Sequence, residues 1–228
     1  MTTNNNQKNK NTQIKKHTSK INTIIWDFDG TICDSLDFAV FEISKITHKF
    51  KLDLKREEIK KMILEESFSK MVKEFKVHKF MLIFMIWKIQ KSLGKKITKF
   101  ELFPGVKTAI IELSKTQELQ ILTANSKSNV EKFLKKHKLE PYFSKITARA
   151  NPFDKSHAIS KHIKKNNLTQ SKTIYIGDEL SDLKACNKIK QKMITVTWGF
   201  NDIKLLNTEN PKHIANVPQE IVSLINEM

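Results

Sequence analysis

The chain has 228 residues, 39% of them hydrophobic and 29% charged, so it can bury a core without disulfides or a structural metal ion. Its longest apolar run, residues 80–87, falls well short of the roughly 20 residues of a membrane-spanning helix, and two cysteines exclude a disulfide framework. The formal net charge is +17, but only Arg56 and Arg149 among the 41 basic residues are arginines, which favours a diffuse positive field over specific nucleic-acid recognition.

Predicted strands alternate with predicted helices along most of the chain. Residues 1–20 are polar and lysine-rich, and we expect a disordered tail there. Short apolar, β-branched runs predict five strands: Ile21–Trp26, Leu119–Thr123, Lys145–Ala148, Thr173–Gly177 and Met193–Thr197. From residue 106 onward, helical periodicity predicts four helices: Val106–Lys115, Lys127–Lys138, Ser156–Asn167 and Leu180–Lys188. This alternation predicts an α/β fold with a doubly wound parallel sheet.

One long segment interrupts the alternation. Most of Leu36–Phe100 shows helical spacing without proline, and a simple crossover between two strands needs far fewer residues. We therefore expect an inserted helical domain at 35–102, with the core formed by 21–34 and 103–228. The apolar run 80–87 within it is interpreted as domain core, with a dimer face or a lid over an apolar substrate as alternatives.

Two aspartates follow the first predicted strand in the sequence Trp-Asp-Phe-Asp-Gly-Thr. Asp27 and Asp29 are two residues apart, so on an extended chain both side chains project from the same side. Two carboxylates in one cleft repel each other, so something must compensate the repulsion, and a divalent cation does so. With such a cation, the first carboxylate can act as a nucleophile and the second as proton donor and acceptor. The plain structural alternative is an Asp-Gly turn.

Three weaker signals lie at later strand ends, each with an ordinary structural alternative. Thr123, Ala124 and Asn125 precede a predicted helix, where a hydroxyl and free N–H groups can bind an anion or simply cap the helix. Lys155 stands where a loop enters a helix, and it is one lysine among many. Asp178, with Glu179 and Asp182 after it, follows the fourth strand, and acids in a first helical turn also complement the helix dipole.

Other reactive patterns are absent from the sequence. The chain has five glycines and no glycine-rich nucleotide loop. No serine lies in a nucleophile elbow, and the seven histidines show no metal-ligand spacing. His157 and His162 are five residues apart, do not share a helix face, and are interpreted as solvated.

The four signals, in this order and each at a strand end, resemble the motifs of the haloacid dehalogenase (HAD) superfamily of phosphotransferases. The sequences Cys33-Asp34-Ser35 and Val196-Thr197-Trp198-Gly199-Phe200 resemble the phosphoglycolate phosphatase-like branch. That branch carries a helical cap between its first and second motifs, which is where the inserted domain falls. The likeness covers residues 21–228 and implies a HAD-like Rossmannoid core. Asp34–Asp37 and Leu102–Gly105 are then expected to be hinges for cap closure.

The resemblance also implies a role for each motif residue. Asp27 is the expected nucleophile, Asp29 the acid and base, and Thr123, Ala124, Asn125 and Lys155 the phosphate-binding residues. Magnesium is expected on the Asp27 carboxylate, the Asp29 backbone carbonyl and Asp178, with Glu179 and Asp182 supporting Lys155 or metal-bound water. The family lysine often precedes a proline, which Lys155 does not, so Lys145 is an alternative.

The resulting hypothesis is a cytoplasmic, Mg²⁺-dependent phosphatase of a small phosphorylated metabolite, working through an aspartyl-phosphate as a monomer or homodimer. A pyrophosphatase or a sugar phosphomutase on the same scaffold are alternatives. So is a catalytically idle basic binding protein, although an idle scaffold has no need of the complete motif set. We expect no membrane partner and no specific nucleic-acid partner.

Overall fold

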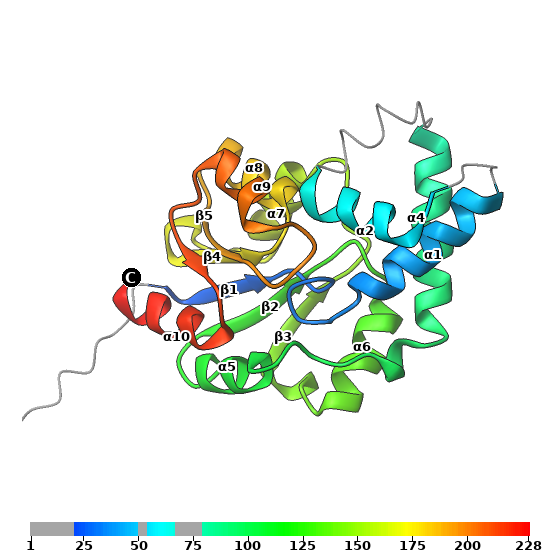
Figure 1. Ribbon diagram of the computed structural model, residues 1–228. Helices are drawn as coiled ribbons and strands as arrows, with labels where there is room; N and C mark the ends of the chain where they lie inside the picture. Colours follow the sequence, from blue (N-terminus) through cyan, green and yellow to red (C-terminus); the bar gives the residue numbers. More distant parts are fainter. Residues whose placement is uncertain (1–20, 50–53, 67–78) are drawn as a thin grey trace, which may run out of the picture.

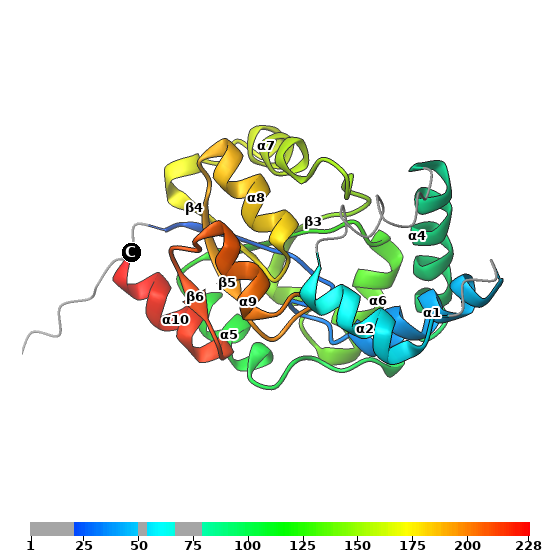
Figure 2. The same ribbon diagram turned by 45° about the horizontal axis from the view of Figure 1, so that its top comes forward.

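The computed structural model describes residues 21–49, 54–66 and 79–228, with the side chains of 79–86 outside the described set. Figures 1 and 2 show one layered α/β body with helices on both faces of a central sheet and a group of helices beyond one edge. The expected tail at 1–20 lies outside the described residues. No helix within the described ranges has both the length and the apolar character needed to cross a bilayer.

The central sheet has six strands, all parallel, in the order β3-β2-β1-β4-β5-β6. Its strands are β1 (Thr23–Trp26), β2 (Glu118–Leu122), β3 (Phe143–Thr147), β4 (Thr173–Gly177), β5 (Lys192–Val196) and β6 (Ile214–Ala215). The five predicted strands are thus present, with ends shifted by at most two residues. The sixth, β6, was not predicted, because two residues carry no detectable period.

Successive side chains of the central strand β1 enter the two cores of the molecule. Ile24 and Trp26, both fully buried, join the cluster beneath one face, and the fully buried Ile25 joins the cluster on the other. Burial on both faces explains why this strand reads as a continuous apolar run. The first face is covered by α5 (Val106–Leu113), α6 (Lys127–His137) and α10 (Pro218–Glu227), and the second by α7 (Lys155–Lys165) and α8 (Leu180–Ile189).

Short elements complete the core. They are α9 (Ile203–Leu206), η2 (Glu140–Tyr142), η3 (Gln170–Lys172) and η4 (Asn207–Glu209). Neither α9 nor α10 was predicted, although α10 begins with a proline in its first turn and buries Ile221, Val222 and Ile225 at helical spacing. The doubly wound parallel sheet predicted from the alternating pattern is confirmed.

His162 corrects one sequence interpretation. It is 2% exposed on α7 rather than solvated, because it inserts between two side chains of the sheet. Gln120 donates its amide N–H to Glu118, so its Oε1 faces His162 and accepts from the ring Nε2 at 2.7 Å. The ring Nδ1 then accepts from the Thr147 hydroxyl at 2.9 Å. Burial lowers the His162 pKa from 6.5 to about 4, so the ring is neutral.

The inserted segment contains α1 (Leu36–Lys49), α2 (Arg56–Glu65), α4 (Lys79–Gly94) and η1 (Ile97–Lys99). Both views place these helices beyond the carboxyl ends of the strands. Most side chains of the apolar run at 80–87 lie outside the described set, and its last residue, Trp87, is 53% exposed.

The two connections to the insertion lie side by side. Cys33 and Leu102 form an antiparallel bridge, and the flanking Asp34 N–H donates to the Glu101 carbonyl at 3.1 Å. The segments expected to be hinges therefore meet as a short two-stranded connection. Both cysteines of the chain, Cys33 and Cys186, are buried free thiols.

Candidate active site

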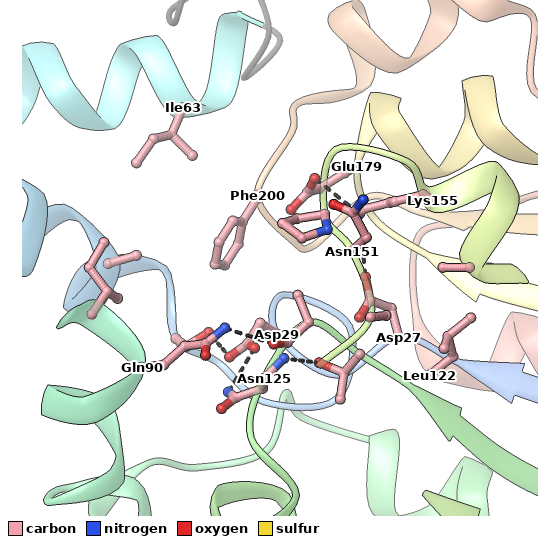
Figure 3. Close-up of a pocket in the computed structure, with 18 of the residues that line it drawn as sticks. Asp27, Asp29, Ile63, Gln90, Leu122, Asn125, Asn151, Lys155, Glu179 and Phe200 are labelled. Carbon is pink, nitrogen blue, oxygen red and sulfur yellow. Dashed lines mark hydrogen bonds and ion pairs between the residues drawn. The ribbon is translucent and has the colours of Figure 1, made fainter. Parts of the chain in front are cut away.

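The site lies where the carboxyl ends of the central strands meet. Asp27 directly follows β1, Thr123 follows β2 and Asp178 follows β4, while Lys155 begins α7 after the β3 connection. Parallel strands end at the same edge of a sheet, which brings these separate segments together. Asp27, Thr123 and Lys155 line one cavity of about 260 Å³, and Asp178 accepts from the N–H of Phe200, which lines the same cavity. Figure 3 shows this cavity.

Asp27 is the central carboxylate of the site. Its N–H donates to the Ile176 carbonyl at 2.8 Å, which continues the β1–β4 pairing, and its Oδ1 accepts from the Phe28 N–H at 2.6 Å. Its Oδ2 lies 3.7 Å from Lys155 Nζ. Burial raises the Asp27 pKa well above its usual range, and Lys155 opposes that rise. A cation beside this carboxylate therefore favours its ionised, nucleophilic form.

Asp29 lines the same cavity and is held by two donors. Its Oδ1 accepts from the Ser35 hydroxyl at 3.0 Å, and its Oδ2 accepts from the Asn125 side-chain amide at 2.9 Å. Burial raises the Asp29 pKa, while these two hydrogen bonds lower it. A carboxyl group whose pKa is raised by burial and lowered by hydrogen bonds is suited to both accept and release a proton.

Three carboxylates form a group that can hold a cation. One oxygen from each of Asp27, Asp178 and Asp182 lies within 4.8 Å of the others. Burial, followed by the charges of Glu179 and Asp182, raises the Asp178 pKa to about 8. Carboxylate oxygens are the donors that Mg²⁺ prefers, and a cation would relieve this repulsion, so the donor set fits the expected metal.

Asp178 is fixed by its surroundings. Its Oδ1 accepts from the Thr31 hydroxyl at 2.6 Å and its Oδ2 from the Phe200 N–H at 2.7 Å. A Cβ atom at Gly30 or at Gly199 would overlap the Asp178 side chain. Gly30 also has a φ of 79°, a conformation that glycine adopts without strain. Both glycines thus leave room for this carboxylate.

Lys155 contacts three acidic residues. Its Nζ lies 2.7 Å from Asp182 Oδ1, 3.2 Å from Glu179 Oε2 and 3.7 Å from Asp27 Oδ2. Burial alone would lower the Lys155 pKa, but these three carboxylates overcome it and hold the pKa well above its usual value. The ammonium is therefore charged. The alternative, Lys145, is exposed on β3 and is not part of the cavity wall, so the geometry favours Lys155.

Asp182 is engaged at both oxygens. Besides Lys155, its Oδ1 accepts from the Tyr175 hydroxyl at 3.2 Å, and its Oδ2 accepts from the Glu179 N–H at 3.2 Å. Burial raises the Asp182 pKa and Lys155 opposes the rise. These contacts suit the expected supporting role, in which Asp182 and Glu179 position the lysine.

The loop after β2 is held by its own side chains. The Thr123 hydroxyl accepts from the Asn125 N–H at 3.0 Å, and the Asn125 side-chain oxygen accepts from Ser126 N–H and from the Asn129 amide at 2.8 and 2.9 Å. The Asn125 backbone N–H is thus bound to Thr123, and one N–H of its side-chain amide is bound to Asp29. Asn125 therefore joins the loop to Asp29, which the sequence did not indicate.

Several contributing residues carried no sequence signal of their own role. Ser35 and Thr31 lie just after the Asp-Gly pair, and Gly199 and Phe200 belong to the loop after β5. Their positions in the short motifs marked the region. Only the fold shows that Thr31, Gly199 and Phe200 surround Asp178.

Comparisons with known proteins show the family and the fold of this chain. A family model described as haloacid dehalogenase-like hydrolase matches residues 24–196. A phosphoglycolate phosphatase from Synechococcus elongatus is 28% identical over 206 residues, which cover 90% of this chain and 97% of that relative. The pyrophosphatase PpaX of Bacillus mycoides is 21% identical over 217 residues, covering 92% and 99%. The crystal structure of a predicted phosphatase from Clostridium acetobutylicum superposes with a TM-score of 0.78 at 19% identity, covering 91% and 99%.

Proposed function

Because the chain belongs to the haloacid dehalogenase-like hydrolase family, we propose that it is a Mg²⁺-dependent phosphatase of a small phosphomonoester. The observation that carries the proposal is the set of charged groups around Asp27. Lys155 Nζ lies 3.7 Å from its Oδ2, and one oxygen each of Asp178 and Asp182 lies within 4.8 Å of an Asp27 oxygen. Relatives named phosphoglycolate phosphatase and pyrophosphatase support phosphoryl chemistry. A binding protein without catalytic activity has no need of the complete motif set, which is Asp27, Asp29, Thr123, Lys155 and Asp178.

In the proposed first step, an Asp27 carboxylate oxygen attacks phosphorus and forms the new O–P bond of an aspartyl-phosphate. The ester P–O bond breaks, and Asp29 transfers its proton to the departing alcohol oxygen. Lys155, with Thr123, binds the phosphoryl oxygens and offsets their charge. Phosphoryl transfer depends mainly on positioning and charge neutralisation of this kind.

In the second step, Asp29 takes a proton from water as the water oxygen attacks phosphorus. The acyl-phosphate O–P bond breaks, inorganic phosphate leaves and the Asp27 carboxylate is restored. Asp27, Asp178 and the backbone carbonyl of Asp29 would hold Mg²⁺. When bound, the ion supplies positive charge that neutralises the phosphoryl group and the acidic cluster.

The inserted helices are proposed to form a cap. In this proposal residues 35–102 are the cap, 21–34 and 103–228 are the catalytic core, and the paired connection at Cys33 and Leu102 is the hinge. The helices contribute one wall of the cavity beside Asp27. We also propose a cytoplasmic enzyme that acts as a monomer or homodimer, with no specific nucleic-acid or membrane partner.

Hydrolysis of an aryl phosphate, with and without Mg²⁺, tests the proposal. We expect Mg²⁺-dependent turnover that Asp27→Asn abolishes, because the amide keeps the size and removes the nucleophile. Glu112→Gln, at a solvent-accessible glutamate on α5 outside the cavity wall, is the matched carboxylate-to-amide control and should keep wild-type turnover. A phosphoryl adduct on Asp27, detected by mass spectrometry after acid quench, should accompany turnover. Turnover retained by Asp27→Asn would contradict the assignment of the nucleophile.

A further inference from the structure

The side chain of Asn129 links the inserted helices to the candidate active site. Asn129 lies in the first turn of α6 and is buried. Its amide nitrogen donates to the backbone carbonyl of Gln90 on α4 at 3.0 Å and to Asn125 Oδ1 at 2.9 Å. A side-chain amide carries two N–H donors, so these two bonds use both of them. Asn129 is not part of the cavity wall, so its effect on the reaction must pass through its neighbours.

Two hydrogen bonds from the start of α6 fix the direction in which the Asn125 amide faces. Asn125 Oδ1 accepts from the Ser126 N–H at 2.8 Å and from Asn129 at 2.9 Å. The amide nitrogen therefore faces the other way, where it donates to Asp29 Oδ2 at 2.9 Å. Figure 3 shows Asn125 beside Asp29 in the cavity. Turning the amide over would lose all three bonds and set its N–H groups against the two donors of α6.

The orientation of the Asn125 amide bears on proton transfer. In the proposed first step, Asp29 gives its proton to the departing alcohol oxygen as the ester P–O bond breaks. An amide N–H that faces Asp29 cannot accept this proton, whereas an amide oxygen in its place would bind it. The observed orientation therefore leaves the proton of Asp29 to the leaving group.

The end of α4 confines the Asn129 side chain from a second direction. Helix α4 ends at Gly94, and a Cβ atom at this position would lie 2.5 Å from Asn129 Oδ1. Non-bonded carbon and oxygen atoms do not approach so closely, so only glycine leaves the space that the amide occupies. With the Gln90 carbonyl bound to its nitrogen and Gly94 against its oxygen, the Asn129 amide lies where α4 allows it.

Building on the proposed function, we infer that Asn129 is a positioning residue for the proton donor Asp29. It acts through Asn125, whose amide it holds in the orientation that donates to Asp29. The inserted helices take part through the Gln90 carbonyl, which holds the other side of the Asn129 amide. Because Ser126 is a second donor to Asn125, loss of Asn129 should weaken this orientation without abolishing it.

Two substrates of similar size but different leaving groups test this role. Phenolate needs a proton to depart readily, whereas 4-nitrophenolate is a much weaker base and departs without one. The value of kcat/KM reports the steps up to the aspartyl-phosphate, so it includes departure of the alcohol and not the attack of water. Asp29→Asn removes the proton and should lower the ratio of kcat/KM for phenyl over 4-nitrophenyl phosphate by about 100-fold.

Asn129→Leu keeps the approximate size of the side chain and removes its donors. The same ratio should fall by about twofold to tenfold, as expected for loss of one hydrogen bond, while kcat/KM for 4-nitrophenyl phosphate stays close to the wild-type value. Asn187→Leu is the matched control, because Asn187 also lies on a helix, α8, and donates to a backbone carbonyl, that of Glu209, outside the cavity wall. It should keep the wild-type ratio.

Gly94→Ala tests the same role from the side of α4. The added methyl group displaces the Asn129 amide, so the ratio should again fall while kcat/KM for 4-nitrophenyl phosphate is kept. Lys95→Ala, at the next and exposed position, is the control and should keep the wild-type ratio. This small substitution also decides the matter if Asn129→Leu does not fold, which thermal unfolding would reveal.

A double variant shows whether the effect passes through Asn125. Asn125→Leu alone should lower the ratio, because it removes the donor to Asp29. In that background Asn129→Leu should lower the ratio no further, since two residues that act in one chain of contacts are not additive. A further decrease as large as that in the wild-type background would overturn the inference.

The outcomes distinguish this inference from the proposed function. A wild-type ratio in Asn129→Leu and Gly94→Ala, or equal losses on both substrates, would overturn the inference. Turnover that depends on Asp27 would in that case leave the proposed function standing. Turnover retained by Asp27→Asn, or no turnover of either substrate by the wild type, would reject the proposed function and, with it, this inference.

Discussion

Lowering the pH should destabilise this protein through His162. The ring is 2% exposed, and burial, followed by the nearby Lys145, lowers its pKa from 6.5 to about 4. In the unfolded chain the ring regains its ordinary pKa, so between pH 6.5 and 4 the unfolded state binds a proton that the folded state does not. The free energy of unfolding must therefore fall as the pH is lowered through this range. Above pH 6.5 the ring is neutral in both states and contributes no pH dependence.

The magnitude follows from the size of the shift. Each unit of pKa difference is worth about 1.4 kcal/mol. Proton linkage then lowers the free energy of unfolding, relative to its value well above pH 6.5, by about 2 kcal/mol at pH 5. The decrease reaches about 3.4 kcal/mol once the ring is protonated in both states, below pH 4. A change of about 2 kcal/mol is a large part of the free energy of unfolding of a typical domain, so the effect is measurable.

Urea unfolding at pH 7 and pH 5 measures the effect in the wild type and in His162→Gln. Glutamine stays neutral, so between pH 7 and pH 5 the free energy of unfolding of the variant should fall by about 2 kcal/mol less than that of the wild type. The acidic residues of the active site titrate in both proteins and cancel in the comparison. His157→Gln, at an exposed position on the same helix, controls for the loss of a histidine. Equal losses in the wild type and His162→Gln would refute the reasoning.

Two further substitutions test the site. Gly199→Ala places a methyl group against the Asp178 carboxyl, so Mg²⁺ affinity measured by calorimetry should fall at least about tenfold; unchanged affinity would reject Asp178 as a ligand. Gln90→Leu removes the bond to the Ala124 carbonyl, which should cost about 0.5–1.5 kcal/mol in kcat/KM. Wild-type kcat/KM in Gln90→Leu would show that this contact does not position the loop.

The core fold was predictable because its strands are buried on both faces. Continuous apolar runs such as those at β1 and β4 admit few other interpretations, and the helices between them fix the parallel topology. Strand β6 pairs with β5 through two residues only, which is too short for any periodic signal. His162 was misread because a polar residue on an amphipathic helix usually faces water, and only tertiary contacts with Gln120 and Thr147 override that rule.

The grouping of the candidate site residues at one edge of the sheet was predictable for a different reason. Asp27, Thr123 and Asp178 each end a strand, and the strand ends of a parallel sheet meet at one edge. Their partners come from segments that sequence order does not relate to them. Phe200 reaches Asp178 from the loop after β5, and Asn125 reaches Asp29 from the loop after β2. Such contacts depend on the packing of whole elements, which short patterns do not encode.

The contacts between the inserted helices and the core connect the cavity wall to the residues around Asp29. Asn129 donates to the backbone carbonyl of Gln90 on α4 at 3.0 Å and to the side chain of Asn125, which in turn donates to Asp29. The same α4 helix presents Ile89 to the cavity. One helix therefore both lines the cavity and joins the hydrogen-bond network around Asp29, the acid and base of the proposed function. We expect a displacement of α4 to disturb both the cavity wall and that network.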